Sequence, residues 1–113
     1  MKRVEKPWGH EIWWAQTDRY VGKILHINAG HRLSLQYHRV KDETLYMQNG
    51  EMDLELENDS GEMETIRMRP GDVRHIKTGR KHRMTAITDC DVFEVSTPEV
   101  DDVVRIEDVY GRV

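Results

Sequence analysis

Four side chains that could ligate a metal stand at short spacings in two stretches of the chain. Gln36, His38 and Glu43 share the first stretch, and His82 lies in the second, T-G-R-K-H-R-M. Gln36 and His38 are two residues apart, so on a β-strand their side chains point to the same side. Glu43 follows five residues after His38, which leaves room for a bend and a return strand. One amide oxygen, one carboxylate and two imidazoles can bind a divalent metal, Zn²⁺ above all, with Mn²⁺, Fe²⁺ or Ni²⁺ as alternatives.

A small β-barrel would bring these four residues together, and the rest of the sequence has the pattern of one. Residues 51–57, E-M-D-L-E-L-E, alternate strictly between acidic and apolar side chains, and the preceding Asn49-Gly50 is a strong hairpin signal. Further strands are expected at 20–28, 32–39, 43–48, 63–68, 73–76, 82–87 and 91–96, with turn signals between them. The pattern predicts an all-β fold, a single-domain barrel of roughly six to eleven strands over residues 1–113. The tail 101–113 is expected to be a short helix or an extended segment over the barrel.

Composition narrows the class of protein further. The chain has 113 residues, a net charge of -4 and 34% charged residues, which fits a globular domain and gives no reason to expect a nucleic-acid partner. No apolar run approaches the roughly 18 residues of a membrane-spanning helix, and the first residues lack the apolar segment of a secretory signal. We therefore expect no membrane partner and a cytoplasmic location. The single cysteine, Cys90, lies between two aspartates and is expected to be inert.

Both metal-ligand stretches resemble the sequence motifs of cupins. The segment from Gly30 to Gly50 fits every spacing of the first motif, G-x5-H-x-H-x3-4-E-x6-G, except that Gln36 stands where most cupins have His. In the second motif, G-x5-P-x-G-x2-H-x3-N, the matching residues are Gly71, Gly79 and His82. The motif's Pro and Asn are replaced by Lys77 and Ala86. The resemblance implies a cupin fold, which is a double-stranded β-helix or jelly-roll barrel, with a metal held by Gln36, His38, Glu43 and His82.

The Gln-x-His variant resembles the one found in phosphomannose isomerases. The opening Lys6-Pro7-Trp8-Gly9 and the closing E-D-V-Y-G-R at 107–112 are similar to segments of the bifunctional mannose-1-phosphate guanylyltransferase/isomerases, so the resemblance covers nearly the whole chain. It implies metal-dependent exchange between an aldose and a ketose, with mannose-6-phosphate and fructose-6-phosphate as the type pair. The chain departs from those enzymes at Lys41 and Thr44, which replace an arginine and a histidine on either side of Glu43.

A phosphosugar substrate needs fixed cations near the metal. Lys23 is the first candidate because it shares a strand face with Leu25 and Ile27, and Arg105 and Arg112 flank the family-like tail. The base that takes the sugar proton is left open between Glu43, Lys41 and His82, and Glu43 can hardly be ligand and base at once.

Two other functions remain open, and a homodimer is expected. The alternatives are a non-catalytic cupin that binds a sugar or metabolite, and a different metal-dependent cupin chemistry such as that of a dioxygenase. Trp13 and Trp14 would face opposite sides of an N-terminal strand. We expect this strand, Glu11 to Gln16, to pair with a second copy of the chain through a sheet edge.

Overall fold

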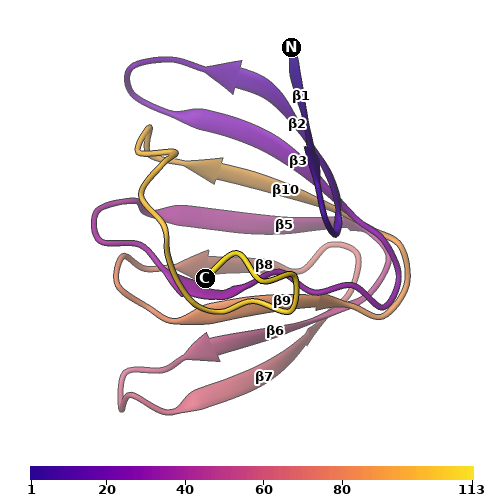
Figure 1. Cartoon of the computed structure of the whole chain (residues 1–113), viewed down its shortest axis with the longest axis vertical. Coiled ribbons are helices and arrows are strands. Elements are labelled where there is room, and N and C mark those ends of the chain that lie inside the picture. Colours follow the sequence, from indigo (N-terminus) through magenta and orange to yellow (C-terminus); the bar gives the residue numbers. More distant parts are fainter.

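Eleven β-strands form two antiparallel sheets in the computed structural model, which describes residues 1–113 (Figure 1). The six-stranded sheet has the order β1-β2-β3-β10-β5-β8. Its strands are β1 Lys2–Lys6, β2 Gly9–Gln16, β3 Val21–Ile27, β10 Cys90–Ser96, β5 Glu43–Asn49 and β8 Val73–Ile76. The five-stranded sheet has the order β11-β4-β9-β6-β7. Its strands are β11 Val104–Glu107, β4 Leu35–Tyr37, β9 His82–Ala86, β6 Met52–Glu57 and β7 Met63–Met68.

Strands that are far apart in the sequence lie side by side in the six-stranded sheet. Figure 1 shows β10, from the late part of the chain, between the early strands β3 and β5. In this register Glu94 lies opposite Lys23 on one side and Leu45 on the other. The all-β fold that the sequence predicted is confirmed, and the structure contains no helix that could span a membrane. The tail is extended, because β11 pairs with β4.

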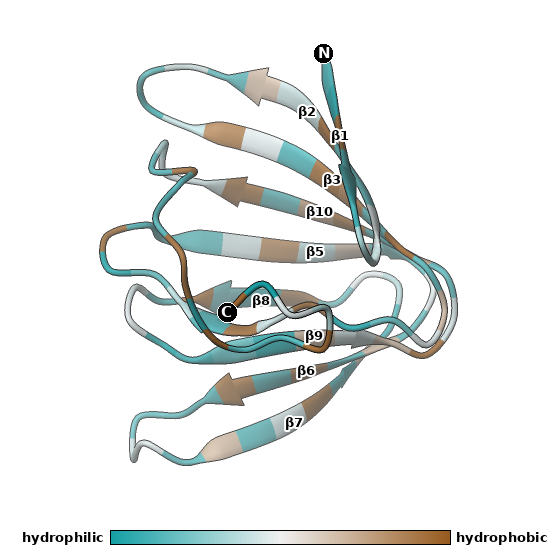
Figure 2. Ribbon diagram, in the orientation of Figure 1, coloured by the Kyte–Doolittle hydropathy of each residue, from teal (hydrophilic) through white to brown (hydrophobic).

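The hydrophobic core fills the space between the two sheets towards one end of the strands. Figure 2 shows hydrophobic and hydrophilic bands alternating along strands such as β10 and β6. On β6, Met52 and Leu54 are fully buried and lie opposite Ala86 and Met84 on β9. The buried cluster consists of Trp8, Leu25, Ile27, Leu33, Leu45, Met47, Met52, Leu54, Met68, Ile76, Met84, Ala86, Cys90 and Val92.

The predicted hairpin between β5 and β6 turns at Asn49-Gly50. Gly50 has a φ of 80°, in the left-handed region that side chains rarely adopt. A Cβ atom at this position would also lie 2.1 Å from the carbonyl oxygen of Asp89. Only glycine meets both constraints, so this turn fixes where β6 begins.

The N-terminal strand β2 differs from the expectation in one respect. It pairs with β1 on one side and β3 on the other, so most of its length is not a sheet edge. Trp13 turns into the barrel, where it lines a cavity, and only Trp14 is exposed on the outside. Only residues 14–16 of β2 lack a partner on the β1 side, so Glu11 to Trp13 offer no free edge to a second copy, and the homodimer itself stays a prediction.

Candidate metal centre and its cavity

The register of the five-stranded sheet places three candidate site residues in one row. Arg105 on β11 lies opposite Gln36 on β4, and Gln36 lies opposite His82 on β9. Directly opposite residues in an antiparallel sheet point their side chains to the same face. The row therefore runs across the inner face of this sheet, from Arg105 at its edge to His82, which is almost fully buried.

The loop that joins β4 to β5 carries His38 and Lys41, and one aspartate holds it in place. The Asp102 carboxylate accepts hydrogen bonds from the backbone N–H groups of Arg39, Val40 and Lys41, at 3.1, 2.7 and 2.9 Å. Three consecutive N–H groups on one carboxylate fix the path of the loop. Glu43 then begins β5 with its side chain buried inside the barrel.

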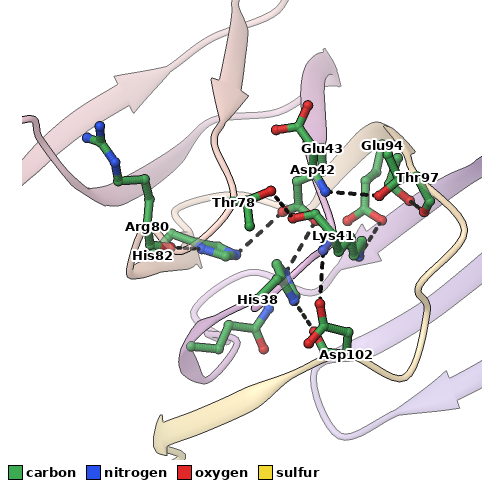
Figure 3. A network of polar contacts seen from close by, with 12 residues as sticks. His38, Lys41, Asp42, Glu43, Thr78, Arg80, His82, Glu94, Thr97 and Asp102 are labelled. Carbon is green, nitrogen blue, oxygen red and sulfur yellow. Dashed lines mark hydrogen bonds and ion pairs between the residues drawn. The ribbon is translucent and has the colours of Figure 1, made fainter.

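His38, Glu43 and His82 converge on one point (Figure 3). His38 Nε2 lies 3.5 Å from Glu43 Oε2, and His82 Nε2 lies 3.4 Å from Glu43 Oε1. One ligand atom from each residue falls within 4.8 Å of the other two. The second ring nitrogen of each histidine contacts a backbone carbonyl oxygen, that of Asp102 for His38 and that of Arg80, at 2.9 Å, for His82.

The arrangement fits a divalent metal ion. The Nε2 atoms of His38 and His82 are buried and have no hydrogen-bond partner, although nearly all buried polar atoms have one. A carbonyl that accepts the Nδ1 proton leaves Nε2 as a lone pair, which is the form a metal binds. Two such nitrogens and a carboxylate supply three ligands of the kind that Zn²⁺ and related ions accept. The His38–Glu43–His82 cluster could therefore bind a metal.

Gln36 lines the cavity beside His38, and its role as fourth ligand stays a prediction. Its side-chain oxygen Oε1 accepts a hydrogen bond from the Ser34 hydroxyl at 2.8 Å. That hydroxyl orients the amide. The other four histidines lie outside the cluster: His10 stacks on His26, and His26, His31 and His75 contact Asp91, Tyr110 and Asp42.

Electrostatics keep the Glu43 carboxylate ionised although it is buried. Burial alone would raise its pKa, but His38, Lys41 and His82 together lower the pKa of Glu43 well below its usual range. Burial also opposes protonation of both histidines. For His82 burial prevails and its pKa is lowered, whereas the adjacent Glu43 carboxylate raises the pKa of His38. Burial thus favours the neutral form of His82, which ligates a metal, whereas the Glu43 carboxylate favours the protonated form of His38, with which a metal would compete.

A cavity of about 140 Å³ opens beside the cluster, and His38 forms part of its wall. The Lys41 ammonium, also in this wall, lies 3.0 Å from Glu43 Oε2 and 3.2 Å from Glu94 Oε2. Although burial opposes it, the charges of Glu94 and Glu43 raise the pKa of Lys41, so the ammonium stays protonated. Burial, followed by the charge of Glu43, raises the pKa of Glu94. Lys41 therefore links the metal cluster to a second buried carboxylate.

The cations predicted to bind substrate differ in how they are paired. Lys23 is buried in the cavity wall, but its ammonium lies 3.6 Å from Glu11 Oε1 and 4.1 Å from the centre of the Trp13 ring. Arg112 donates two side-chain hydrogen bonds to Asp108, at 2.7 and 3.1 Å.

Arg105 and Lys6 form no ion pair. Both line the main cavity and a smaller neighbouring one, and Arg105 Nε is buried without a hydrogen-bond partner. Free positive charge in the cavity wall is therefore concentrated at Arg105 and Lys6.

Sequence reasoning did not assign Glu11, Glu94 or Lys6 to the site, although Lys6 begins the family-like K-P-W-G segment. Glu94 and Glu11 alternate with apolar neighbours, in D-V-F-E-V-S and E-I-W-W, and the pattern suggested nothing beyond strands. The sequence alone does not reveal the position of Glu94, because only the structure shows that it shares its strand face with the fully buried Val92.

The sequence matches the family model described as mannose-6-phosphate isomerase C-terminal over residues 1–108. The chain belongs to this family. It is a cupin, as the motifs at Gly30–Gly50 and Gly71–Ala86 predicted. No curated protein matches the sequence.

Solved cupin structures share the fold at low sequence identity. KdgF from Halomonas sp. matches with a TM-score of 0.78 and 21% identity, over 89% of this chain and 91% of its own. An oxalate decarboxylase from Lactobacillus farciminis, solved as a formate complex, matches with a TM-score of 0.77 and 19% identity, over 93% of this chain and 33% of its own. A Bacillus subtilis oxalate decarboxylase variant matches with a TM-score of 0.82 and 13% identity, over 99% of this chain and 32% of its own. The chain thus spans about a third of the oxalate decarboxylases, and these matches describe the fold alone.

Replacing one ligand should remove the metal and leave the barrel folded. In His82→Ala the affinity for Zn²⁺ should fall at least about 100-fold, since even residues that only orient a ligand contribute 10–100-fold. Metal content after dialysis, with circular dichroism as the check on folding, measures this. The control is His26→Ala, which removes an imidazole outside the cluster and should keep the wild-type metal content. Full metal content in His82→Ala would show that the cluster is not the binding site.

Proposed function

We propose that this chain is a metal-dependent isomerase of a phosphorylated hexose, with mannose-6-phosphate and fructose-6-phosphate as the aldose–ketose pair. The observation that carries the proposal is the His38–Glu43–His82 cluster beside a cavity whose wall holds two cations without ion pairs. Membership of the mannose-6-phosphate isomerase C-terminal family supports the same reaction.

The cluster would serve the chemistry at C1 and C2 of the sugar. A divalent metal bound there, Zn²⁺ first and Mn²⁺, Fe²⁺ or Ni²⁺ as alternatives, would supply a Lewis acid that polarises the carbonyl and hydroxyl oxygens. His38 and His82 are oriented by the carbonyl oxygens behind them, and Glu43 supplies the negative charge of the ligand set. The Lys41 ammonium adds a fixed positive charge at the cavity wall, which favours negative charge that develops on the sugar oxygens.

The phosphate would lie further along the cavity, next to Arg105. Two strand spacings separate Arg105 from His82 in their shared row, which is about 10 Å between backbones. That separation is of the same order as the distance from C1 and C2 of a hexose to its 6-phosphate. Arg105 and Lys6 are suited to a dianion because no acidic side chain neutralises them, unlike Lys23 and Arg112.

Turnover is the first test of this function. Protein loaded with Zn²⁺ or Mn²⁺ should form fructose-6-phosphate from mannose-6-phosphate, and EDTA or His38→Ala should abolish the activity because the ligand set is lost. His26→Ala should retain it. Fructose-6-phosphate is measured in a coupled assay. Metal-dependent binding of the phosphosugar without any turnover would instead favour a non-catalytic sugar-binding cupin.

Arg105→Ala should weaken the binding of mannose-6-phosphate by about 1.5–3 kcal/mol, the range for hydrogen bonds to charged groups. It should leave metal content and the affinity for unphosphorylated mannose unchanged, because Arg105 is assigned to the phosphate alone. Isothermal titration with both sugars measures the difference. The exposed Arg74→Ala is the control. Equal affinities of the wild-type protein for the two sugars would remove the phosphate from the proposal.

A further inference from the structure

Glu94 is a buried carboxylate in the wall of the main cavity that belongs to no ligand set. It lies on β10, with its side chain turned into the barrel beside Lys41. Because Lys41 contacts an oxygen of Glu94 and an oxygen of Glu43, these two oxygens are no more than about 6 Å apart. A sugar held at the metal cluster would therefore have Glu94 within reach of the carbon atoms next to its coordinated oxygens.

The other buried ionisable side chains near the cavity already have a structural role or a second partner. Each histidine of the cluster has Nδ1 at a backbone carbonyl and Nε2 directed to the proposed metal site beside Glu43. Lys41 is held between two carboxylates. Glu11 accepts a hydrogen bond from Trp13 Nε1 at 2.8 Å and pairs with Lys23. Among the buried acids of the wall, only Glu94 has a lysine as its sole polar contact and no role in holding the cluster.

We infer that Glu94 is the proton-transfer residue of the proposed isomerisation, an inference that rests on the proposed function. The Glu94 carboxylate removes the proton from C2, the electron pair of the C–H bond forms the C1–C2 double bond, and the carbonyl pair moves to O1. The Lys41 ammonium faces the negative charge that results. Glu94 then returns its proton to C1, and the proton of O2 moves to O1 as the new carbonyl forms at C2. All atoms balance, and the reaction requires no oxidant, reductant or second substrate.

Glu94→Gln, which keeps the shape and removes the base, tests this role. Its kcat should fall about 10²–10⁴-fold, the usual contribution of a general base. The KM for mannose-6-phosphate and the metal content should stay close to wild type. In D₂O the wild-type protein should incorporate deuterium at C1 of the product, and Glu94→Gln should not. Glu94→Asp, which keeps a carboxylate, should retain part of the turnover and part of the deuterium incorporation. The exposed Glu62→Gln is the control and should behave as wild type.

The outcomes separate this inference from the function on which it rests. If the wild-type protein has no turnover, the proposed function falls and Glu94 loses its role with it. If the wild-type protein and Glu94→Gln turn over equally well, only the assignment of Glu94 is wrong. Loss of metal together with activity in Glu94→Gln would also overturn it, because that result indicates a positioning role for the cluster.

A separate observation concerns the outer face of the six-stranded sheet. One row of apolar side chains runs across five strands in register: Ile12, Ile24, Phe93, Tyr46 and Val73. Trp14 and Val95 extend the row along their strands, and these seven residues are called the outer apolar face. Its most exposed members are Trp14, Tyr46, Val73 and Val95, with exposures of 48%, 41%, 55% and 51%.

The two outer faces of the barrel differ, although the pair of His26 and Asp91, at 2.8 Å, lies beside the apolar row on the six-stranded sheet. The outer face of the five-stranded sheet carries ion pairs, such as Arg67 with Asp53 at 2.6 Å and Arg32 with Glu55 at 3.7 Å. An antiparallel sheet with one face in water normally alternates in this way, with polar residues outside. On the other sheet Trp14 lies against the backbone of Gly22, where an added Cβ would be 2.6 Å from the indole. The indole is thus packed flat on the sheet and forms part of a continuous apolar surface.

We propose that a second copy of this chain covers the outer apolar face. The five strands, four of seven or eight residues and β8 of four, lie about 4.8 Å apart and give the sheet a face of roughly 500 Å² in projection, with the outer apolar face at its centre. A rough side-chain surface has a larger accessible area, which approaches the roughly 800 Å² that each partner of a stable complex buries. The seven residues carry no charge, so a two-fold arrangement places the face against itself without repulsion.

Val95→Glu and Val73→Glu test this contact, because each places a charge within a self-complementary apolar interface, Val95 on the inner strand β10 and Val73 on the edge strand β8. Wild-type protein should be a dimer at micromolar concentration in analytical ultracentrifugation. Each variant should raise the dimer dissociation constant at least about 100-fold, since an unpaired charge is costly to bury. Val109→Glu, the same change at an exposed valine elsewhere, should remain dimeric. A monomeric wild type, or a folded Val95→Glu that still dimerises, would falsify the proposal.

Discussion

The buried negative charge of Glu43 is the constraint on which the rest of the interior depends. An ionised carboxylate inside a protein costs several kcal/mol unless it is paired on all sides. Here His38, Lys41 and His82 surround it, and they come from the loop after β4 and from the start of β9. The charge is therefore satisfied only when both sheets are in place, so the site depends on the closure of the barrel.

Lys41 connects the buried charge of Glu43 to the charged side chains of the cavity wall. Its ammonium is shared between Glu43 and Glu94, and the Lys23–Glu11 pair lies in the same wall. Opposite charges thus compensate one another within the interior, while the row of Arg105, Gln36 and His82 leaves one cation free at its end. An interior whose charges are paired with one another, with uncompensated positive charge at the edge of the cavity, is suited to a ligand that brings its own negative charge.

Much of the fold and the metal cluster could be predicted from the sequence, because local spacing determines them. The interval from His38 to Glu43 spans one turn, and Asn49-Gly50 fixes the next. Glu94 could not be found in this way. In Asp91–Ser96, hydrophobicity favours Phe93 as the inward residue, whereas the structure turns Val92 and Glu94 inside and exposes Val95. The tail was ambiguous because β11 forms only by pairing with β4, from a distant part of the chain.

The inward residues of each strand change character along its length, and this separates the site from the core. On β5 they run from Glu43 through Leu45 to Met47, and on β9 from His82 through Met84 to Ala86. Ionisable groups collect at one end of the barrel and apolar groups at the other. Because charged side chains occupy inward positions of β2, β3 and β10, some of the apolar residues of these strands face outwards. The polar cavity and the outer apolar face therefore follow from the same distribution of residues on one sheet.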